Sequence, residues 1–188
     1  VKKWGERDAL IVRHQNIRWT YLELQEKVNT FAAGLLSLGL EPGDRVGIWS
    51  PNNSEWVIVQ YATAKAGLIL VNINPAYRVA ELEYAINKVS CKALILASSF
   101  KSSDYVSMVG ELAPEIHKSK PGDISCVRLP SLKTVIQIGG ETNDGYFDFE
   151  QISGLASNKG RERLETLSDE LQFDDPINIQ FTSGTTGM

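Results

Sequence analysis

Short aliphatic runs alternate with amphipathic runs along this chain, and that alternation limits the folds it can adopt more than any other feature. Four short runs have the length and β-branched content of buried strands, at residues 45–49, 68–71, 93–96 and 134–138. Helical patterns lie between them, at residues 55–66, 79–89 and 105–112. Strands that alternate with helices are typical of a largely parallel sheet with helices on both faces. We therefore predict an α/β fold.

A first helix is indicated ahead of these units. Thr20 and Glu23 have the spacing of a capping box, in which each residue satisfies a free backbone N–H near the helix start. Apolar residues then recur at intervals of three and four up to Leu38, and Gly39 supplies a stop signal. The pattern predicts an amphipathic helix that packs on another element.

The second half of the chain is less regular. The polar stretch between Pro114 and Pro130 is expected to be a surface loop. The charged segment 158–175 is expected to be partly helical, over residues 161–171, with its mixed charges on a solvated face. Residues 177–181 read as one more strand.

Composition excludes several classes of protein. The 188 residues are 43% hydrophobic and 22% charged, which is typical of one soluble globular domain. The formal net charge of -4 and the lack of a dense Lys/Arg run argue against a nucleic-acid-binding surface, so a small-molecule partner is expected.

The sequence predicts neither a membrane span nor a targeting peptide. The most apolar stretch, residues 56–71, is interrupted by Gln60, Lys65 and Gly67, so no transmembrane segment is predicted. The chain starts at Val1 without a charged and then apolar leader, so no targeting peptide is expected within it.

The residue types that most often carry catalysis or metals are sparse and scattered. Cys91 and Cys126 lie far apart without metal-type spacing, and each is expected to be a buried free thiol. His14 and His117 have no partner at a recognisable spacing, so surface or packing roles are expected. No catalytic residue and no metal ligand is assigned from the sequence.

The most informative segment follows the last predicted strand. It contains two glycines, whose backbone can approach an anion closely, and four hydroxyl side chains that can donate hydrogen bonds. Such a loop after a strand suits phosphate, with Mg²⁺ needed to offset the charge, although a generic Ser/Thr/Gly cluster is more often only a turn. The glycines are too close together, and no Lys-Ser/Thr pair follows, for a Walker A loop. The candidate nucleotide-phosphate contacts are Thr182, Ser183, Gly184, Thr185, Thr186 and Gly187.

Residues 181–187 resemble the hallmark phosphate-binding motif of the adenylate-forming superfamily, which includes acyl-CoA synthetases, luciferases and peptide-synthetase adenylation domains. Segments 19–21, 39–46, 51–52, 65–67 and 74–75 resemble the N-terminal pattern of the same superfamily, in the same order. The resemblance implies that residues 1–188 are the N-terminal part of the AMP-binding domain, within the large N-terminal domain of such an enzyme, and end inside the phosphate-binding loop. The upstream matches are expected to be turn and cap residues rather than ligands: Gly39, Pro42, Gly43, Asp44, Arg45, Asn74 and Pro75.

Within the superfamily the chain looks most similar to mitochondrial medium-chain acyl-CoA ligases. The resemblance implies that a fatty carboxylate attacks ATP to form acyl-AMP and pyrophosphate, and that the thiol of coenzyme A then displaces AMP. It also implies Mg²⁺, a mitochondrial location, and the remainder of the same polypeptide, including a C-terminal domain, as a partner. Because those regions carry other parts of the site, this chain alone is expected to be inactive.

Two other functions stay open from the sequence. In the superfamily the motif continues through Pro-Lys-Gly, whereas this sequence ends at Met188. A truncated, non-catalytic interaction or regulatory module is one alternative. The other is adenylation of a different carboxylate, of the amino-acid or luciferin type, because the same loop serves those reactions.

Overall fold

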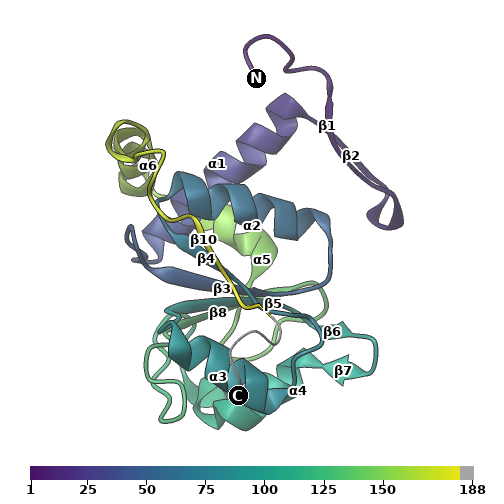
Figure 1. Ribbon diagram of the computed structural model, residues 1–188, viewed down its shortest axis with the longest axis vertical. Helices are drawn as coiled ribbons and strands as arrows, with labels where there is room; N and C mark the ends of the chain where they lie inside the picture. The colour runs from purple at the N-terminus through teal and green to yellow at the C-terminus, as the bar shows by residue number, and fades with distance from the viewer. Residues whose placement is uncertain (183–188) are drawn as a thin grey trace.

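A six-stranded sheet divides the molecule into two layers in the computed structural model, which describes residues 1–182 (Figure 1). Every pair of neighbouring strands in this sheet is parallel, which confirms the predicted sheet type. The strand order is β10-β4-β3-β5-β8-β9. The bounds of these strands are β3, Arg45–Trp49; β4, Ile69–Asn72; β5, Ala93–Ala97; β8, Thr134–Ile138; β9, Phe147–Asp148; and β10, Asn178–Gln180.

Helices cover both faces of the sheet, as the sequence predicts (Figure 1). Above the sheet in this view lie α1, Tyr21–Ser37; α2, Ser54–Lys65; α5, Phe149–Ile152; and α6, Asn158–Glu170. Below it lie α3, Val79–Lys88, and α4, Tyr105–Leu112. The helices predicted at residues 55–66, 79–89 and 105–112 therefore form with boundaries shifted by at most one residue.

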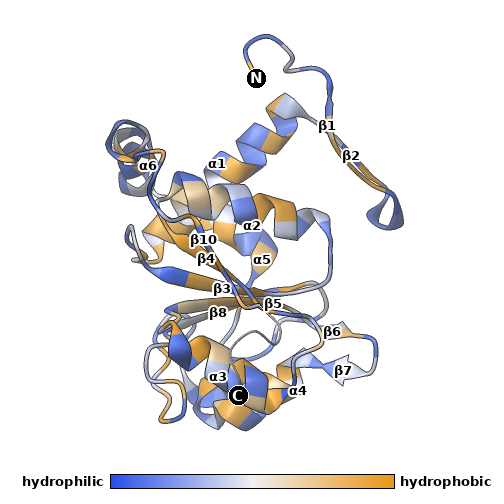
Figure 2. Ribbon diagram, viewed as in Figure 1, coloured by the Kyte–Doolittle hydropathy of each residue, from blue (hydrophilic) through white to orange (hydrophobic). Residues whose placement is uncertain are grey.

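The strands build a separate hydrophobic cluster on each face, because successive side chains point to opposite sides of a sheet. Leu70 joins the cluster formed with α1 and α2, whereas Val71 joins the cluster formed with α3 and α4. Residues on both faces of the central strands are apolar (Figure 2), as is usual for a parallel sheet that is buried on both sides.

The predicted capping box starts α1. The Thr20 hydroxyl accepts a hydrogen bond from the Glu23 backbone N–H at 3.2 Å, and the Glu23 carboxylate accepts one from the Thr20 N–H at 2.7 Å. The hydrogen bonds that the Glu23 carboxylate accepts from the Thr20 backbone N–H and, at 3.1 Å, from the Thr20 hydroxyl lower the pKa of this exposed carboxyl. The helix continues to Ser37, and Gly39 follows in a left-handed conformation, with a φ of 84°.

Replacing Thr20 by Ala is expected to lower the free energy of unfolding by about 1 kcal/mol, because the first turn of α1 loses a side-chain acceptor. Thr20→Ser keeps that acceptor and should therefore lower the free energy of unfolding by less. Urea unfolding of the two variants checks the difference. Equal stability of Thr20→Ala and the unaltered protein would argue against a stabilising cap.

The segment between Pro114 and Pro130 is only in part the surface loop that the sequence predicts, since most of its side chains are exposed but several apolar ones are buried. A short 3-10 helix occupies Pro114–Lys118, and Ile116, Ile124 and Leu129 are buried in the lower cluster. Isolated apolar residues at irregular intervals carry no periodic signal, which is why a polar loop was expected. The segment therefore lies on the surface and also covers one end of the lower layer.

Small elements at the margins of the sheet were also missed. Two antiparallel pairs form outside the main sheet, β1 with β2 and β6 with β7. The β1–β2 hairpin projects from the upper layer beside the start of α1 (Figure 1). These elements are β1, Asp8–Val12; β2, Ile17–Thr20; β6, Ser99–Phe100; β7, Ser103–Asp104; and the 3-10 turns Arg13–Gln15 and Ser153–Leu155.

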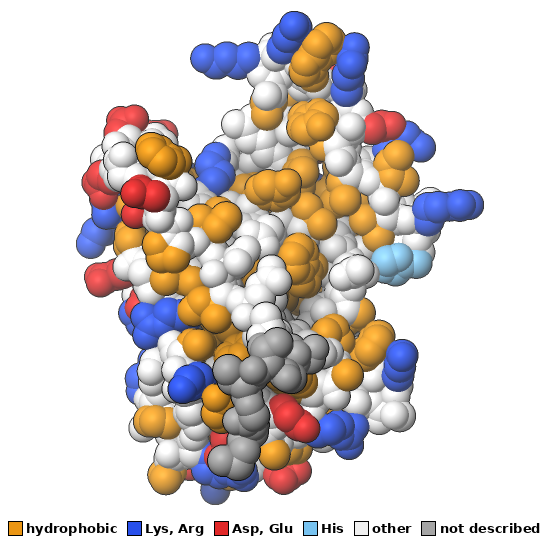
Figure 3. All heavy atoms as spheres, in the orientation of Figure 1, with side chains coloured by type: hydrophobic (Ala, Val, Ile, Leu, Met, Phe, Trp, Pro, Cys, Tyr) orange, Lys and Arg blue, Asp and Glu red, His pale blue; other side chains and the backbone are white. Residues whose placement is uncertain are grey.

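The charged segment forms a longer helix than predicted, since α6 spans Asn158–Glu170. Acidic side chains gather on its outer surface (Figure 3), and Arg163 pairs with Glu170 across two turns at 2.6 Å. Gly160 packs so closely on α1 that an added Cβ would lie 2.6 Å from the carbonyl oxygen of Ala33. The helix is therefore held by its inner face, and its charges lie on a solvated face as expected.

Both cysteines are buried free thiols, as the sequence indicates. Burial raises the pKa of the Cys91 thiol to about 12, so it stays protonated at physiological pH. Within residues 1–182, none of the helices combines the length and the apolar composition needed to cross a membrane.

Candidate functional site

The candidate site lies at the carboxyl edge of the parallel sheet, where β3, β4 and β10 end side by side. In register, Asn72 of β4 lies between Ile48 of β3 and Gln180 of β10. Thr182, the first candidate phosphate contact, follows β10 at this edge and is exposed. The other candidate contacts lie outside the described residues: Ser183, Gly184, Thr185, Thr186 and Gly187. Ligands of open parallel sheets bind at this edge, so the fold presents Thr182 where a ligand is expected.

Contacts with β4 and the lower cluster fix the path of β10. The backbone N–H of Leu70 donates to the carbonyl oxygen of Ile177 at 3.0 Å, which starts the pairing of the two strands. Ile179 and Phe181 both pack against the lower cluster, and the ring of Phe181 lies 6.5 Å from that of Tyr84 on α3. The contacts of Ile179 and Phe181, which flank Gln180, thus fix where the chain leaves β10 and enters the candidate loop.

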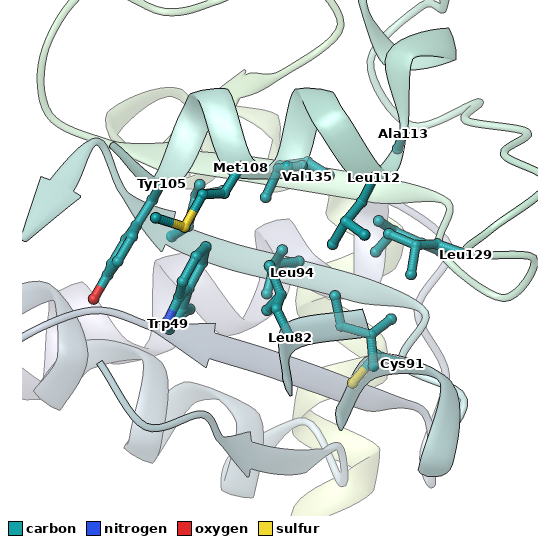
Figure 4. Close-up of a cluster of buried hydrophobic side chains, with 14 of the residues drawn as sticks. Trp49, Leu82, Cys91, Leu94, Tyr105, Met108, Leu112, Ala113, Leu129 and Val135 are labelled. Atoms are coloured by element: carbon teal, nitrogen blue, oxygen red, sulfur yellow. The ribbon is translucent and has the colours of Figure 1, made fainter. Parts of the chain in front are cut away.

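The loop after β4 is anchored by two buried aromatic residues. The indole N–H of Trp49 donates to the carbonyl oxygen of Asn74 at 3.1 Å, and the Tyr105 hydroxyl donates to that of Pro75 at 2.5 Å. The two rings stack with centroids 3.7 Å apart (Figure 4), and burial raises the pKa of the Tyr105 hydroxyl to about 12. Tyr105 therefore stays protonated and can donate this hydrogen bond, so two buried side chains hold the loop after β4 in place.

The loop between β3 and α2 is held by its own amide and hydroxyl groups. Asn53 caps α2 by accepting a hydrogen bond from the Trp56 N–H at 2.8 Å, and its amide donates to the Ser50 hydroxyl at 2.9 Å. The Ser54 backbone N–H donates to the side-chain oxygen of Gln15 at 2.7 Å. Gln15 belongs to the turn of the β1–β2 hairpin, so the hairpin that the sequence did not predict supports this rim of the site.

The rim is polar but uncharged. Residues 50–53, 72–75 and 180–182, which form the carboxyl ends of β3, β4 and β10, include no acidic or basic side chain. These segments contribute no carboxylate, and the N-terminus of α2, which favours an anion, lies at the same edge of the sheet; the nearest acidic residue there is Glu55 in the first turn of α2, whose carboxylate accepts hydrogen bonds from Gln15 and Ser54. These residues fit a nucleotide phosphate group. They offer no carboxylate for a dedicated Mg²⁺ cage, but Mg²⁺ in such sites is commonly held largely by the phosphates themselves.

The upstream residues that match the superfamily pattern serve as turn and anchoring residues, as predicted. Gly43 takes a φ of 86° just before β3, at the opposite, amino edge of the sheet. Asp44 accepts from the Glu41 backbone N–H at 2.8 Å and pairs with Lys92 at 2.7 Å. At the other edge, the Asn74 side chain accepts from the Ala76 N–H at 2.9 Å and closes the turn after β4.

A polar hollow of about 510 Å³ lies further along the carboxyl edge, beyond β5 and β8. Gln137 is 2% exposed and shapes its wall, because its amide donates to the carbonyl oxygens of Gly139 and Glu141 while its oxygen accepts from Asn143 at 2.8 Å. Gln137 was not predicted from the sequence, since a lone Gln inside an aliphatic strand gives no periodic signal.

Comparison with curated proteins gives close relatives. The chain is 46% identical over 182 residues to "Medium-chain acyl-CoA ligase ACSF2, mitochondrial" of Bos taurus, covering 97% of this chain and 30% of that protein. The protein of the same name from Danio rerio is 45% identical over 187 residues, covering 100% and 31%. A relative from Bacillus subtilis is 39% identical over 184 residues. The chain therefore spans about a third of the length of the curated relatives it matches.

Solved structures share the fold. The anthranilate CoA ligase AuaEII in complex with anthranoyl-AMP superposes with a TM-score of 0.76 at 20% identity, covering 98% of this chain and 31% of that one. The acetoacetyl-CoA synthetase from Streptomyces lividans superposes with a TM-score of 0.71 at 28% identity, covering 93% of this chain and 25% of that one. The family model described as AMP-binding enzyme matches residues 1–188. This chain belongs to the AMP-binding enzyme family.

Proposed function

We propose that the full-length protein containing this chain is an acid-thiol ligase that activates a fatty acid, with medium chain length as the first expectation. The observation that carries the proposal is the motif Thr182–Gly187, which directly follows a strand at the carboxyl edge of the parallel sheet. The relatives named as medium-chain acyl-CoA ligases support the acyl chain length. Residues 1–188 would supply the first part of the AMP-binding domain.

The proposed reaction has two steps. A carboxylate oxygen attacks the α-phosphorus of ATP, which forms acyl-AMP and releases pyrophosphate. The thiolate of coenzyme A then attacks the acyl carbon, which forms the thioester and releases AMP, while the thiol proton passes to solvent. Mg²⁺ would neutralise part of the charge on the phosphates of ATP during the first step.

In this proposal the loop acts by position and hydrogen bonding. Its backbone N–H groups and hydroxyls would bind the β- and γ-phosphates, with Thr182, Ser183 and Thr185 as the main side-chain donors. Each hydrogen bond to a charged acceptor contributes about 1.5–3 kcal/mol, so several would hold the phosphates without a basic side chain. The rim at residues 50–53 and 72–75 supports the same assignment, because none of these residues is acidic.

The test is an assay of the full-length protein with fatty acids of graded chain length and with a panel of amino acids. We expect ATP-dependent release of pyrophosphate with fatty acids, the highest rate with medium chains, and thioester formation only when coenzyme A is present. Turnover of an amino acid but of none of the fatty acids would replace this proposal with amino-acid adenylation. Absence of turnover with every acid would favour a non-catalytic module.

A mitochondrial location is the corresponding proposal for the compartment. It is supported by the names of the Bos taurus and Danio rerio relatives, whereas the Bacillus subtilis relative shows that the family also occurs outside mitochondria. Fractionation of cells that express the full-length protein tests it, and recovery in the cytosolic fraction would contradict it.

A further inference from the structure

The outer side of α2 is apolar although it faces solvent. Ile58 and Ala62 are buried in the upper cluster, as expected for a helix that packs on a sheet. The other side carries no charge either, because α2 has no acidic or basic residue between Glu55 and Lys65 at its two ends. Tyr61 on this outer side is 54% exposed. A helix that is hydrophobic all round is normally buried, so α2 has the composition of a helix that a further part of a protein covers.

The strand β10 leaves one edge of the main sheet open. It stands at one end of the strand order and, among residues 1–182, pairs only with β4. The carbonyl oxygen of Ile177 faces β4, where it accepts from the Leu70 N–H. Backbone groups alternate between the two edges of a strand, so the N–H and C=O groups of Asn178 and Gln180 point to the open edge. Unpaired strand edges bind other strands readily, and folded proteins usually cover them.

These two features belong to one continuous face. Tyr61 lies three residues before Ala64 and so on the same side of α2, and Ala64 lines a hollow of about 240 Å³ together with Ile177, just before β10. On the other side of β10, Tyr84 of α3 is 56% exposed, and its ring lies 6.5 Å from that of Phe181. Hydrophobic side chains gather over this part of the surface (Figure 3). We call Tyr61, Ile177, Tyr84 and the open edge of β10 the β10 face.

The chemistry of the β10 face favours a polypeptide over a lipid surface or a nucleic acid. Residues 176–182 and 56–64 contain no Lys or Arg, so an anionic bilayer or a phosphate backbone meets no cation there. Tyrosine and aliphatic side chains beside unpaired strand groups instead suit a polypeptide that supplies apolar side chains and a strand. The family provides such a polypeptide, because this chain matches only 30% of the Bos taurus relative and the rest of that protein lies outside the match.

We propose that the β10 face is the surface on which the rest of the same polypeptide, outside residues 1–188, packs, and that the open edge of β10 accepts a further strand from it. Removal of Tyr61, Ile177 and Tyr84 from water stabilises this contact. The added strand satisfies the outward backbone groups of Asn178 and Gln180. The inference concerns the assembly of the protein and holds whichever carboxylate the protein activates.

The test uses the unaltered full-length protein and compares tyrosines of one molecule. Tetranitromethane nitrates exposed tyrosine rings, and mass spectrometry of peptides gives a rate for each ring. Tyr21 at the start of α1 is the matched control, because it is 45% exposed and lies outside the β10 face. We expect Tyr61 and Tyr84 to react at least about 10-fold more slowly in the native protein than in urea, and Tyr21 less than about 3-fold more slowly.

Hydrogen–deuterium exchange of the same protein tests the added strand. The outward N–H groups of Asn178 and Gln180 should exchange at least about 100-fold more slowly than in an unfolded chain, because each would be paired with the added strand. Exchange of both groups at the unfolded rate would overturn the pairing at the open edge.

Three results of the nitration experiment would overturn the inference. Reaction of Tyr61 and Tyr84 at close to their rates in urea would show that the β10 face stays exposed. Equal slowing at Tyr21 would show general shielding rather than a contact at this face. Protection that is lost on about 100-fold dilution would assign the face to a second copy of the chain, because only a contact between molecules depends on concentration. None of these measurements uses a fatty acid or ATP, so a failure here is distinct from a failure of the proposed function.

Discussion

Replacing Trp49 by Ala is expected to lower the free energy of unfolding by about 3–5 kcal/mol, the range for removing a large aromatic side chain from a core. Trp49 is 0% exposed, and its ring stacks on Tyr105 with centroids 3.7 Å apart. Its indole N–H is also bonded to the carbonyl oxygen of Asn74, which would lose that donor. Because Tyr105 holds the same loop through Pro75, the change would loosen a wall of the candidate site as well as the lower core.

Equilibrium urea unfolding measures this effect, and Trp56→Ala is the matched control. Trp56 is only half-buried on α2, at the margin of the upper cluster, so the same change there should cost clearly less. Equal losses in the free energy of unfolding for Trp49→Ala and Trp56→Ala would contradict the larger contribution that the burial of Trp49 predicts.

Replacing Thr185 by Val in the full-length protein is expected to lower kcat/KM for acid-dependent ATP–pyrophosphate exchange by about 100- to 1,000-fold, the usual effect of removing one donor that stabilises a transition state. Valine has nearly the same shape as threonine but lacks the hydroxyl. The proposed phosphate contact is lost while the volume is kept. Synthetic acyl-AMP supplied with coenzyme A should still form thioester at close to the normal rate, because that step involves no β- or γ-phosphate.

Thr30→Val is the control for this experiment. Thr30 is half-buried on α1, away from the candidate site, and its hydroxyl donates to the carbonyl oxygen of Glu26 within the helix, so its replacement should leave both half-reactions unchanged. If Thr185→Val slowed the two half-reactions equally, the loop would have a role other than binding the phosphates of ATP.

Much of the fold could be predicted because its central units are locally specified. The strand at Arg45–Trp49 and the helix at Tyr105–Leu112 have the bounds that the sequence pattern indicates. In both segments, the length, the period of the apolar residues and the flanking turn residues all indicate the same type of element. The capping box of Thr20 and Glu23 could also be predicted, because its hydrogen bonds join residues only three apart in the sequence.

The features that could not be predicted depend on long-range contacts. Ile124 and Leu129 lie in a polar segment without periodicity, and only the lower core that they cover makes them buried. The candidate loop was identified from residues 182–187 alone, whereas the groups that brace its entrance lie far away in the chain. Asn72 and Trp49 reach the site only through strand register and packing, so no local pattern marks them.

The pairing of β10 with β4 also sets an order of assembly during synthesis. Strands β3, β4, β5 and β8 all emerge from the ribosome before β10, and they can pair among themselves with helices α2, α3 and α4 already made. Asn178 pairs with Leu70, which lies far away in the sequence, and contacts of high sequence separation form slowly. Nascent chains halted before residue 178 should thus hold a folded centre whose candidate phosphate-binding edge is still incomplete, with the open side of β4 exposed to other strands.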